Sequence, residues 1–305
     1  MSAYLSDEKF NRFKLTEEEF LNVENNIIKY FGKTDTCSNP TLYLIGGEPG
    51  CGKTGIEKLI VKENSNCVVC NSDNLRDFHS KMQLLKKHCA EAYVEISAFY
   101  AQKWNQKLIQ FCKENKYNVL IETTFRDYKI IKKTYEDFKK EGYKIEIHLM
   151  SVNKYLSKLG IYKRYEDQIQ SEGFGRKVSV EDYESRYESV LPTLKKVHEL
   201  KLYDEIFLYT RSILESKAVN NIKKIDVAKE LAKLNKFKSV KVRGQFTLLK
   251  LFLHFRNKNL NLIEQRALNK RFFDILRMMK NRNAPKEEKY IYLEHFPEFN
   301  IAKKY

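Results

Sequence analysis

Short apolar runs alternate with longer helical patterns through the middle of the chain. The apolar runs are rich in Val, Ile and Leu and are candidate strands, at residues 42–45, 68–70, 119–121, 145–149 and 205–208. Candidate helices with apolar residues three or four apart lie between them, at residues 55–62, 90–116, 129–141, 153–168 and 179–200. Apolar strands that alternate with helices are typical of a parallel sheet covered on both faces. The pattern therefore predicts an α/β fold of three layers around a five-stranded parallel sheet.

Helical patterns also flank this α/β domain. Near the N-terminus, Thr16 and Glu19 have the spacing of a capping box, and a helical run of apolar residues follows, ending at Gly32. In the last 90 residues one apolar stripe stands out, formed by Leu268, Phe272, Ile275, Leu276 and Met279. We therefore expect an N-terminal helical segment at 1–40, the α/β domain at 41–212, and a basic, mostly helical C-terminal region at 213–305.

The composition is that of a folded protein, with 42% hydrophobic and 31% charged residues and only 11 glycines and 5 prolines in 305 residues. These proportions exclude a collagen-like or low-complexity chain. No apolar run reaches the ~20 residues that a transmembrane helix needs. The first residues also lack the basic and then apolar segments of a signal peptide. We therefore expect a soluble cytoplasmic protein with reduced cysteines, in which Cys67 and Cys70 pack inside a strand.

The net charge of +16 is concentrated at one end of the chain. Residues 216–305 hold 22 Lys and Arg against 8 Asp and Glu, a net of +14, whereas residues 1–215 hold 34 against 32. A surplus of this size is typical of a region that contacts an acidic protein, nucleic acid or an anionic membrane surface. The simplest alternative is a basic helical appendage that packs on the α/β domain and keeps it soluble.

A glycine-rich stretch follows the first candidate strand and opens the first candidate helix. It matches the phosphate-binding sequence G-x-x-x-x-G-K-[ST] at every position, with the residues Gly47, Glu48, Pro49, Gly50, Cys51, Gly52, Lys53 and Thr54. Such a loop turns successive backbone N–H groups toward phosphate oxygens, and the helix N-terminus adds its partial positive charge. Lys53 can reach the β and γ phosphates, and the Thr54 hydroxyl can ligate Mg²⁺. The loop predicts a site for ATP or GTP, and the chain lacks the Asn-Lys-x-Asp sequence that reads guanine.

The second candidate strand leads into Asp73, which is a candidate general base. In a kinase built on a phosphate loop, this strand end lies across the cleft from the γ-phosphate, where an Asp can accept the proton of an attacking hydroxyl. Arg76 and His79 follow and are candidates to line the substrate site. An Asp after a strand also commonly caps a helix, and the position alone leaves both interpretations open.

A candidate lid follows the fourth strand. Two glycines and a basic pair stand between two predicted helices, with Arg164 on the first helix and Arg176 in the loop. A loop of this kind can bring an arginine onto the transferring phosphate. The alternative is an ordinary solvated connection between helices.

The ordered series of these motifs resembles the zeta toxins, the kinase components of epsilon–zeta toxin–antitoxin systems. The series runs Leu-Ile-Gly-Gly-x-Pro-Gly-x-Gly-Lys-Thr, Asp-x-x-Arg-x-x-His, Ile-Glu-x-Thr, Arg-Tyr-Glu and a lid Arg, over roughly residues 40–211. The resemblance implies a P-loop kinase fold and ATP-dependent phosphorylation of the 3′-hydroxyl of the N-acetylglucosamine unit in UDP-N-acetylglucosamine. It also implies an antitoxin partner that blocks the ATP site, and a product that starves cell-wall synthesis.

The resemblance also assigns roles to particular residues. Asp73 falls on the general base, Lys53 on the phosphate site and Thr54 on the Mg²⁺ site. Glu122 and Thr124 fall on a substrate-side motif. The two phosphate-stabilising arginines of the family correspond to Arg164 and Arg176.

The chain departs from the family pattern at three positions. Ser80 replaces a usual Pro and Thr123 a common Gly, and Gln106 aligns near an acidic residue that contacts the sugar. The last change leaves the acceptor open, because a lost carboxylate weakens sugar binding or signals another acceptor. Two other functions remain as alternatives: a polynucleotide kinase that uses the basic region to bind nucleic acid, and a non-catalytic ATP-dependent binding module.

Overall fold

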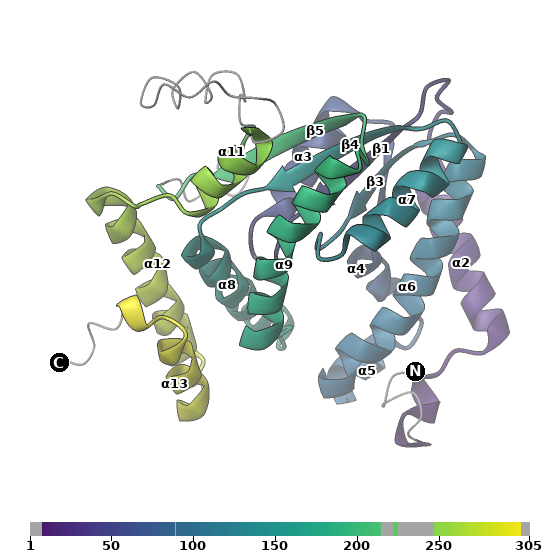
Figure 1. The fold of residues 1–305 in the computed structure, drawn as a ribbon. Helices are drawn as coiled ribbons and strands as arrows, with labels where there is room; N and C mark the ends of the chain where they lie inside the picture. The colour runs from purple at the N-terminus through teal and green to yellow at the C-terminus, as the bar shows by residue number, and fades with distance from the viewer. Residues whose placement is uncertain (1–7, 89, 215–221, 225–246, 300–305) are drawn as a thin grey trace.

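A six-stranded sheet lies at the centre of the molecule, with helices on both of its faces (Figure 1). The computed structural model describes residues 8–88, 90–214, 222–224 and 247–299. The strands are β1 (Thr41–Gly46), β2 (Cys67–Cys70), β3 (Asn118–Glu122), β4 (Lys144–Met150), β5 (Glu205–Arg211) and β6 (Ile222–Lys224). Their order across the sheet is β2-β3-β1-β4-β5-β6.

The first five strands are parallel, as the sequence pattern predicts. β6 pairs antiparallel with β5 and was not predicted, because three residues are too few to show a strand pattern. In a parallel sheet all carboxyl ends lie at one edge. The residues that follow β1, β2, β3 and β4 therefore start from the same edge of the sheet.

The helices and short helical turns connect the strands or lie at the two ends of the chain. Before β4 they are η1 (Glu8–Phe13), α2 (Glu17–Phe31), α3 (Lys53–Glu63), α4 (Ser72–Leu75), η2 (Arg76–Phe78), α5 (Met82–His88), α6 (Ala90–Glu114) and α7 (Tyr128–Lys140). After β4 they are α8 (Lys154–Glu172), α9 (Val180–Glu199), α11 (Thr247–Arg256), α12 (Leu262–Asn281), α13 (Lys286–Glu294) and η4 (Pro297–Phe299). Thr16 and Glu19 form the expected capping box at the start of α2.

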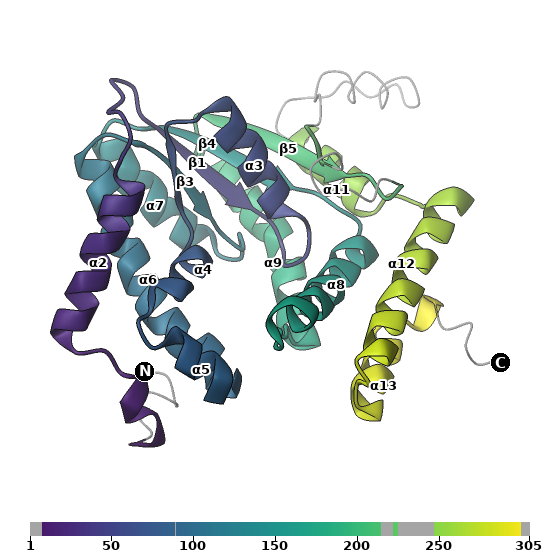
Figure 2. The same ribbon diagram turned by 180° about the vertical axis from the view of Figure 1, so that it is seen from behind.

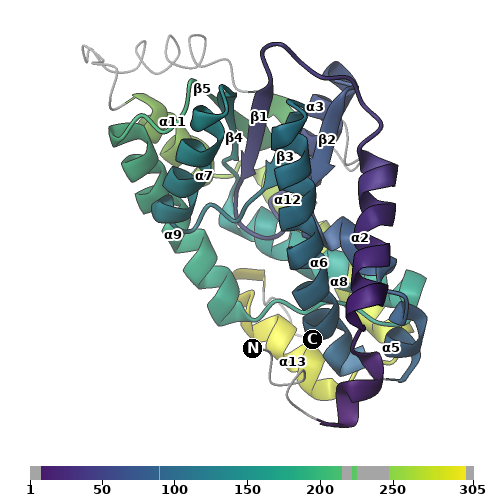
Figure 3. The same cartoon turned by 90° about the vertical axis from the view of Figure 1, so that its right-hand side faces the viewer.

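Alternate residues of the strands face two separate cores. Leu42 and Leu44 of β1 face a core built with α6, α7 and α9, which α2 and α11 extend (Figures 1 and 3). Tyr43 and Ile45 face the other core, built with α3, α8 and α12 (Figure 2). This alternation follows from the two-residue repeat of a strand and completes the three layers.

The described part of the C-terminal region belongs to both cores. α12 lies along α8 and buries its predicted apolar stripe there. α11 packs on α9, and the Phe252 carbonyl of α11 also accepts a hydrogen bond from the hydroxyl of Ser151, just after β4, at 2.6 Å. Arg282 bonds both carboxylate oxygens of Glu166, which is nearly fully buried in α8. None of the described helices is both long and apolar enough to cross a membrane.

Candidate active site

The glycine-rich loop joins β1 to α3 and wraps around the start of that helix. Gly52 directly precedes α3 and has a φ of +111°, and Gly50 has a φ of +76°. Residues with a side chain rarely adopt such positive φ angles. At Gly50 a Cβ would also lie 2.1 Å from the Ser157 carbonyl oxygen of α8. Glycine is therefore needed at Gly50 for both its backbone conformation and its contact with α8.

Lys53 lies at the centre of this loop. Its ammonium group donates to the carbonyls of Gly47 at 2.9 Å and Glu48 at 3.1 Å. It also lies 3.5 Å from a carboxylate oxygen of Glu122, at the end of β3. The side chain is only 8% exposed. The loop carbonyls and Glu122 thus hold a buried cation at the carboxyl edge of the sheet, beside backbone N–H groups of the helix start.

Asp73 stands in the first turn of α4, directly after β2. The cap of α4 is Asn71, whose side chain accepts from the Asp73 N–H, so the Asp73 carboxylate does not act as the cap. Instead it accepts from Arg76 at 3.0 Å and from Arg176 at 2.8 Å to each oxygen. Partial burial favours the neutral acid, but the two arginines outweigh burial and hold the pKa of Asp73 below its ordinary value.

Two arginines of the predicted lid region interact with Asp73, one by hydrogen bonds and the other through its charge. Arg176 reaches it from the loop between α8 and α9, and its backbone N–H donates to the Gln168 side chain at 3.0 Å. Arg164 of α8 is half-buried, and its Nε is buried without a hydrogen-bond partner among the described residues. Burial and the charge of Arg176 lower the pKa of Arg164, whereas Asp73 and Glu122 oppose that change. The lysine and arginine side chains of the site therefore outnumber its carboxylates, and the site has a net positive charge.

The structure does not bring every predicted residue to this cluster. His79 is 2% exposed and lies edge-on to Tyr100 and Trp104, and its Nδ1 accepts from the Lys81 N–H at 3.1 Å. Thr124 is half-buried in the loop after β3, two residues beyond Glu122. Thr54 follows Lys53 in the first turn of α3 and is exposed. The predicted site residues other than His79 thus lie at, or close to, the carboxyl edge of the sheet.

The residues at this edge suit a magnesium ion that is shared with phosphates. Mg²⁺ is usually held by a hydroxyl or one or two carboxylates, with water and phosphate oxygens completing six ligands. The exposed Thr54 hydroxyl and the half-buried Glu122 carboxylate are the groups of this kind beside Lys53. Within the described ranges, no cluster of three or more His, Cys, Asp or Glu forms a metal cage of its own.

Sequence reasoning missed two arginines beside the loop. Arg211, at the end of β5, donates to the Gly50 carbonyl at 3.4 Å. The guanidinium of Arg256 of α11 lies 3.4 Å from the centre of the Tyr187 ring. Burial raises the pKa of Glu48 in the loop, and the charge of Arg256 opposes this rise. No local pattern signals either arginine, because each is more than 150 residues from the loop it affects.

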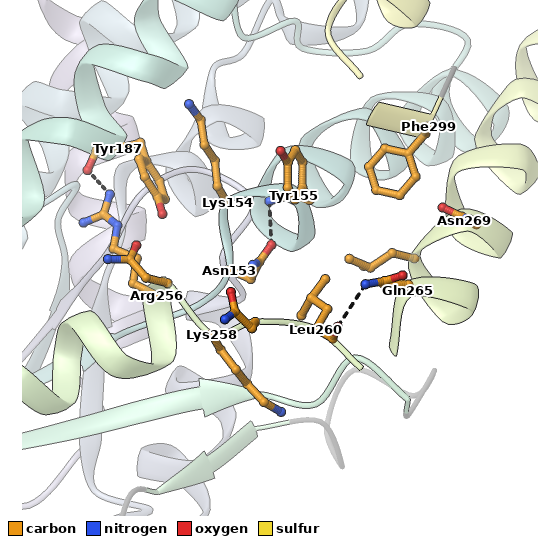
Figure 4. A pocket seen from close by; sticks show the side chains of 13 residues that line it. Asn153, Lys154, Tyr155, Tyr187, Arg256, Lys258, Leu260, Gln265, Asn269 and Phe299 are labelled. Atoms are coloured by element: carbon orange, nitrogen blue, oxygen red, sulfur yellow. Dashed lines mark hydrogen bonds between the residues drawn. The ribbon is translucent and has the colours of Figure 1, made fainter. Parts of the chain in front are cut away.

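A cavity of about 620 Å³ lies between the start of α8, α9 and the chain that joins α11 to α12 (Figure 4). Lys154 and Lys258 border it, but their ammonium groups point away from each other (Figure 4). They pair with Glu184 at 2.5 Å and Glu264 at 2.6 Å. Because these cations are already paired and do not converge, we do not include this cavity in the candidate site.

Comparisons with known proteins show which family the chain resembles. Residues 28–221 match the family described as Zeta toxin. Toxin PezT of Streptococcus pneumoniae is 29% identical over 197 residues, which are 63% of this chain and 78% of that protein. Toxin zeta of Streptococcus pyogenes is 26% identical over 204 residues, which are 66% of this chain and 71% of that protein.

A solved structure of the PezAT chromosomal toxin–antitoxin system of Streptococcus pneumoniae has a similar fold. Its TM-score is 0.68 at 21% identity, and the match covers 87% of this chain and 99% of the other. This likeness extends beyond the family match and confirms the predicted α/β fold with a helical C-terminal region. The family match covers well over half of the chain and includes the glycine-rich loop, Asp73 and Arg176. The chain therefore belongs to the zeta toxin family of kinase-like toxins.

Proposed function

We propose that the protein is an ATP-dependent kinase that phosphorylates a hydroxyl of a nucleotide sugar. The proposed acceptor is the 3′-hydroxyl of the N-acetylglucosamine unit in UDP-N-acetylglucosamine. One observation carries the proposal: an ionised Asp73 stands at the carboxyl edge of the sheet that also carries Lys53, and lid Arg176 bonds both of its oxygens. Membership of the zeta toxin family supports a kinase function for this site.

Lys53, the loop N–H groups and the helix start would bind the triphosphate. Lys53 is already directed into the loop by the carbonyls of Gly47 and Glu48, so little of its side-chain freedom would be lost on binding. Thr54 and Glu122 would hold Mg²⁺, which would neutralise negative charge on the phosphates. Arg164 has an unpaired, buried Nε and is placed to neutralise charge on the transferred group.

Asp73 would orient the acceptor hydroxyl and take its proton. As the acceptor oxygen bonds to the γ-phosphorus, the bond from that phosphorus to the β–γ bridging oxygen breaks, and ADP leaves. The pKa of Asp73 is lowered, which makes it a weak base. A weak base suffices when the transition state is loose, because the proton is transferred late and positioning supplies most of the catalysis. Arg176 would move from Asp73 to the phosphoryl group when the substrates bind.

The acceptor is the part of the proposal that depends most on family membership. Gln106, which aligns near the family's acidic sugar contact, is exposed on α6. Arg76 is better placed to line an acceptor site, because it bonds both Asp73 and Ser97 of α6. We further propose that an antitoxin protein occupies the ATP site in the cytoplasm and blocks this reaction.

The experiment that tests the proposal is a reaction with defined substrates. Purified protein is incubated with ATP, Mg²⁺ and a panel of UDP-sugars, and mass spectrometry detects a phosphate added to any of them. We expect UDP-N-acetylglucosamine to gain one phosphate with wild-type protein and with Lys103→Gln, an exposed control on α6. Lys53→Ala should abolish the product. A panel without product, from protein that binds ATP, would contradict the proposed acceptor class.

A further inference from the structure

The sequence Arg-Tyr-Glu in α8 contains two residues that the proposed mechanism does not use, Tyr165 and Glu166. Glu166 is buried, and Arg282, directly after α12, bonds its two carboxylate oxygens at 2.8 and 2.9 Å. Tyr165 is half-buried, and the Arg282 guanidinium lies 5.7 Å from the centre of its ring. The C-terminal region therefore contacts both of these residues.

The lid loop, residues 173–179, contacts Tyr165 on both sides of Arg176. Gly175 precedes Arg176, and a Cβ at Gly175 would lie 2.6 Å from the Tyr165 ring and 2.7 Å from the Tyr165 carbonyl oxygen. Lys177 follows Arg176, and its ammonium group lies 5.4 Å from the centre of the same ring. The Arg176 N–H itself donates to Gln168, three residues beyond Tyr165 on the same helix face, at 3.0 Å. Three consecutive lid residues thus contact one face of α8.

Glu288 of α13 links the lid loop to Arg282. Its carboxylate accepts from Arg282 at 2.9 Å and lies 3.5 Å from the Lys177 ammonium group. Burial favours the neutral acid, but Arg282 and Lys177 outweigh burial and hold the pKa of Glu288 below its ordinary value. Lys177 is 64% exposed, so its ion pair contributes little by itself. The Tyr165 ring and the close approach of Gly175 therefore carry most of the contact.

We propose that Tyr165 is a positioning residue, which holds the lid loop so that Arg176 reaches the site of phosphoryl transfer in a defined geometry. Arg282 and Glu288 keep the Tyr165 ring in place, so α12 and α13 take part in ordering the lid. An arginine that is held in advance loses less conformational freedom in the transition state. The effect on phosphoryl transfer rests on the proposed function, whereas the hold on the lid loop does not depend on the acceptor.

Four variants of the full chain separate this contact from general stability. Gly175→Ala places a methyl group against Tyr165 without backbone strain, because the φ of Gly175 lies outside the left-handed region. Tyr165→Leu removes the ring, whereas Tyr165→Phe keeps it. Gly173→Asn is the matched control in the same loop, because open space surrounds Gly173 and Asn tolerates its φ of +79°. Thermal melting confirms that each variant is folded.

Hydrogen exchange measures the hold on the lid loop without any substrate. Mass spectrometry follows exchange in peptides that span residues 173–179, relative to the same peptides unfolded. We expect Gly175→Ala and Tyr165→Leu to exchange about fivefold faster than the wild type, the scale of one lost ring contact. Tyr165→Phe and Gly173→Asn should stay close to the wild type. Exchange at the wild-type rate in both Gly175→Ala and Tyr165→Leu would overturn the inference.

A double-mutant cycle with Arg176→Gln tests whether Tyr165 acts through Arg176. Transfer from ATP to UDP-N-acetylglucosamine gives kcat and KM for each protein. We expect Tyr165→Leu to lower kcat about tenfold with little change in the KM for ATP, a coupling typical of residues in one contact network. In the Arg176→Gln background the same change should lower kcat less than about twofold, because the positioned group is absent. Equal losses in the two backgrounds would overturn the inference.

Failure of the proposed function gives a different result. The proposed function fails if the wild type binds ATP but transfers no phosphate to the sugar nucleotide. Hydrogen exchange in residues 173–179 would then still decide whether Tyr165 holds the lid loop.

Discussion

At the carboxyl edge of the sheet, the position of some site residues can be predicted from the sequence and the position of others cannot. Lys53 and Asp73 follow strands that the apolar pattern predicts, so their shared edge follows from the parallel topology. Arg211 and Arg256 reach the loop from distant parts of the chain, and no local pattern reveals that approach. His79 carries the family motif, yet the structure buries it among aromatic rings. The roles of the site residues therefore stay predictions, which the following experiments address.

Buried His79 should make the folded protein less stable in mild acid. Burial and, to a smaller extent, the charge of Lys81 lower the pKa of His79 to about 4, against the opposing charge of Glu19. The unfolded chain, with a histidine pKa near 6.5, therefore binds the proton more readily. Between pH 7.5 and 5 the free energy of unfolding should fall by about 2 kcal/mol from this group. Denaturant unfolding at the two pH values measures the loss.

The control for this prediction is His79→Asn, which keeps an acceptor for the Lys81 N–H but does not titrate in this range. Its free energy of unfolding should change by about 2 kcal/mol less than that of the wild type between the same two pH values. Equal changes in the two proteins would show that His79 is not the group responsible.

The arginines around Asp73 should set the acid limit of phosphoryl transfer. Because Arg176 and Arg76 hold the pKa of Asp73 below its ordinary value, the carboxylate should stay ionised below about pH 4. Arg76→Gln removes one of these cations, so the acid limb of kcat/KM should move to higher pH. Rates from pH 3.5 to 8 measure the limb, and Lys103→Gln serves as the control. An unmoved limb in Arg76→Gln would argue against Asp73 as the titrating base.

At the scale of elements, the sequence predicted the parallel strands and most helices, because their apolar periodicity is local. It did not predict β6, whose three residues carry no strand pattern. The contact between the loop and α8 also has no local signal, because Gly50 and Gly160 are 110 residues apart. A Cβ at Gly160 would meet the Gly50 carbonyl, and a Cβ at Gly50 would meet the backbone of Ser157 in α8. We therefore expect the position of α8, the helix that carries Arg164, to affect nucleotide binding at the loop.

Gly160→Ala tests the contact between the loop and α8. Alanine in a helix interior usually adds up to about 1 kcal/mol of stability relative to glycine. Here the new Cβ would lie 2.4 Å from the Gly50 carbonyl oxygen, so we expect lower stability and weaker ATP binding. Gly142→Ala is the comparison, because open space surrounds that position although its φ is +80°. Gly142→Ala should lose some stability while binding ATP normally. If Gly160→Ala also binds ATP normally, the contact between the loop and α8 does not affect nucleotide binding.

At the scale of the whole molecule, the basic C-terminal region proves to be part of the packing. The charge count left open a contact with a partner or a basic helical appendage that packs on the α/β domain, and the described residues fit the packing alternative. Composition by itself does not reveal how much of the region is buried. In the structure, Phe272, Tyr292 and Phe296 complete the core that also contains β1 and α3. The predicted boundary near residue 212 therefore separates a nearly neutral sequence from a basic one. It does not mark a structural separation, because the described part of the C-terminal region packs on the α/β domain.

Deletion of residues 247–305 should prevent normal folding. It removes α11, α12 and α13 and exposes apolar residues of α8 on which α12 packs. We expect the shortened chain to lose its cooperative thermal transition or to aggregate. Arg266→Glu with Lys280→Glu lowers the charge at two exposed positions of α12 and should leave melting unchanged. A shortened chain that melts cooperatively, as the full chain does, would show that the region is a separable appendage.

Phosphoryl transfer by the wild-type protein and by Asp73→Asn decides whether Asp73 is the general base. Transfer from γ-labelled ATP to UDP-N-acetylglucosamine is followed beside ATP binding by the same preparations. We expect the wild type to form labelled sugar nucleotide, and Asp73→Asn to bind ATP yet form at least about 100-fold less product, the scale of general-base catalysis. Near-normal transfer by Asp73→Asn would contradict the account.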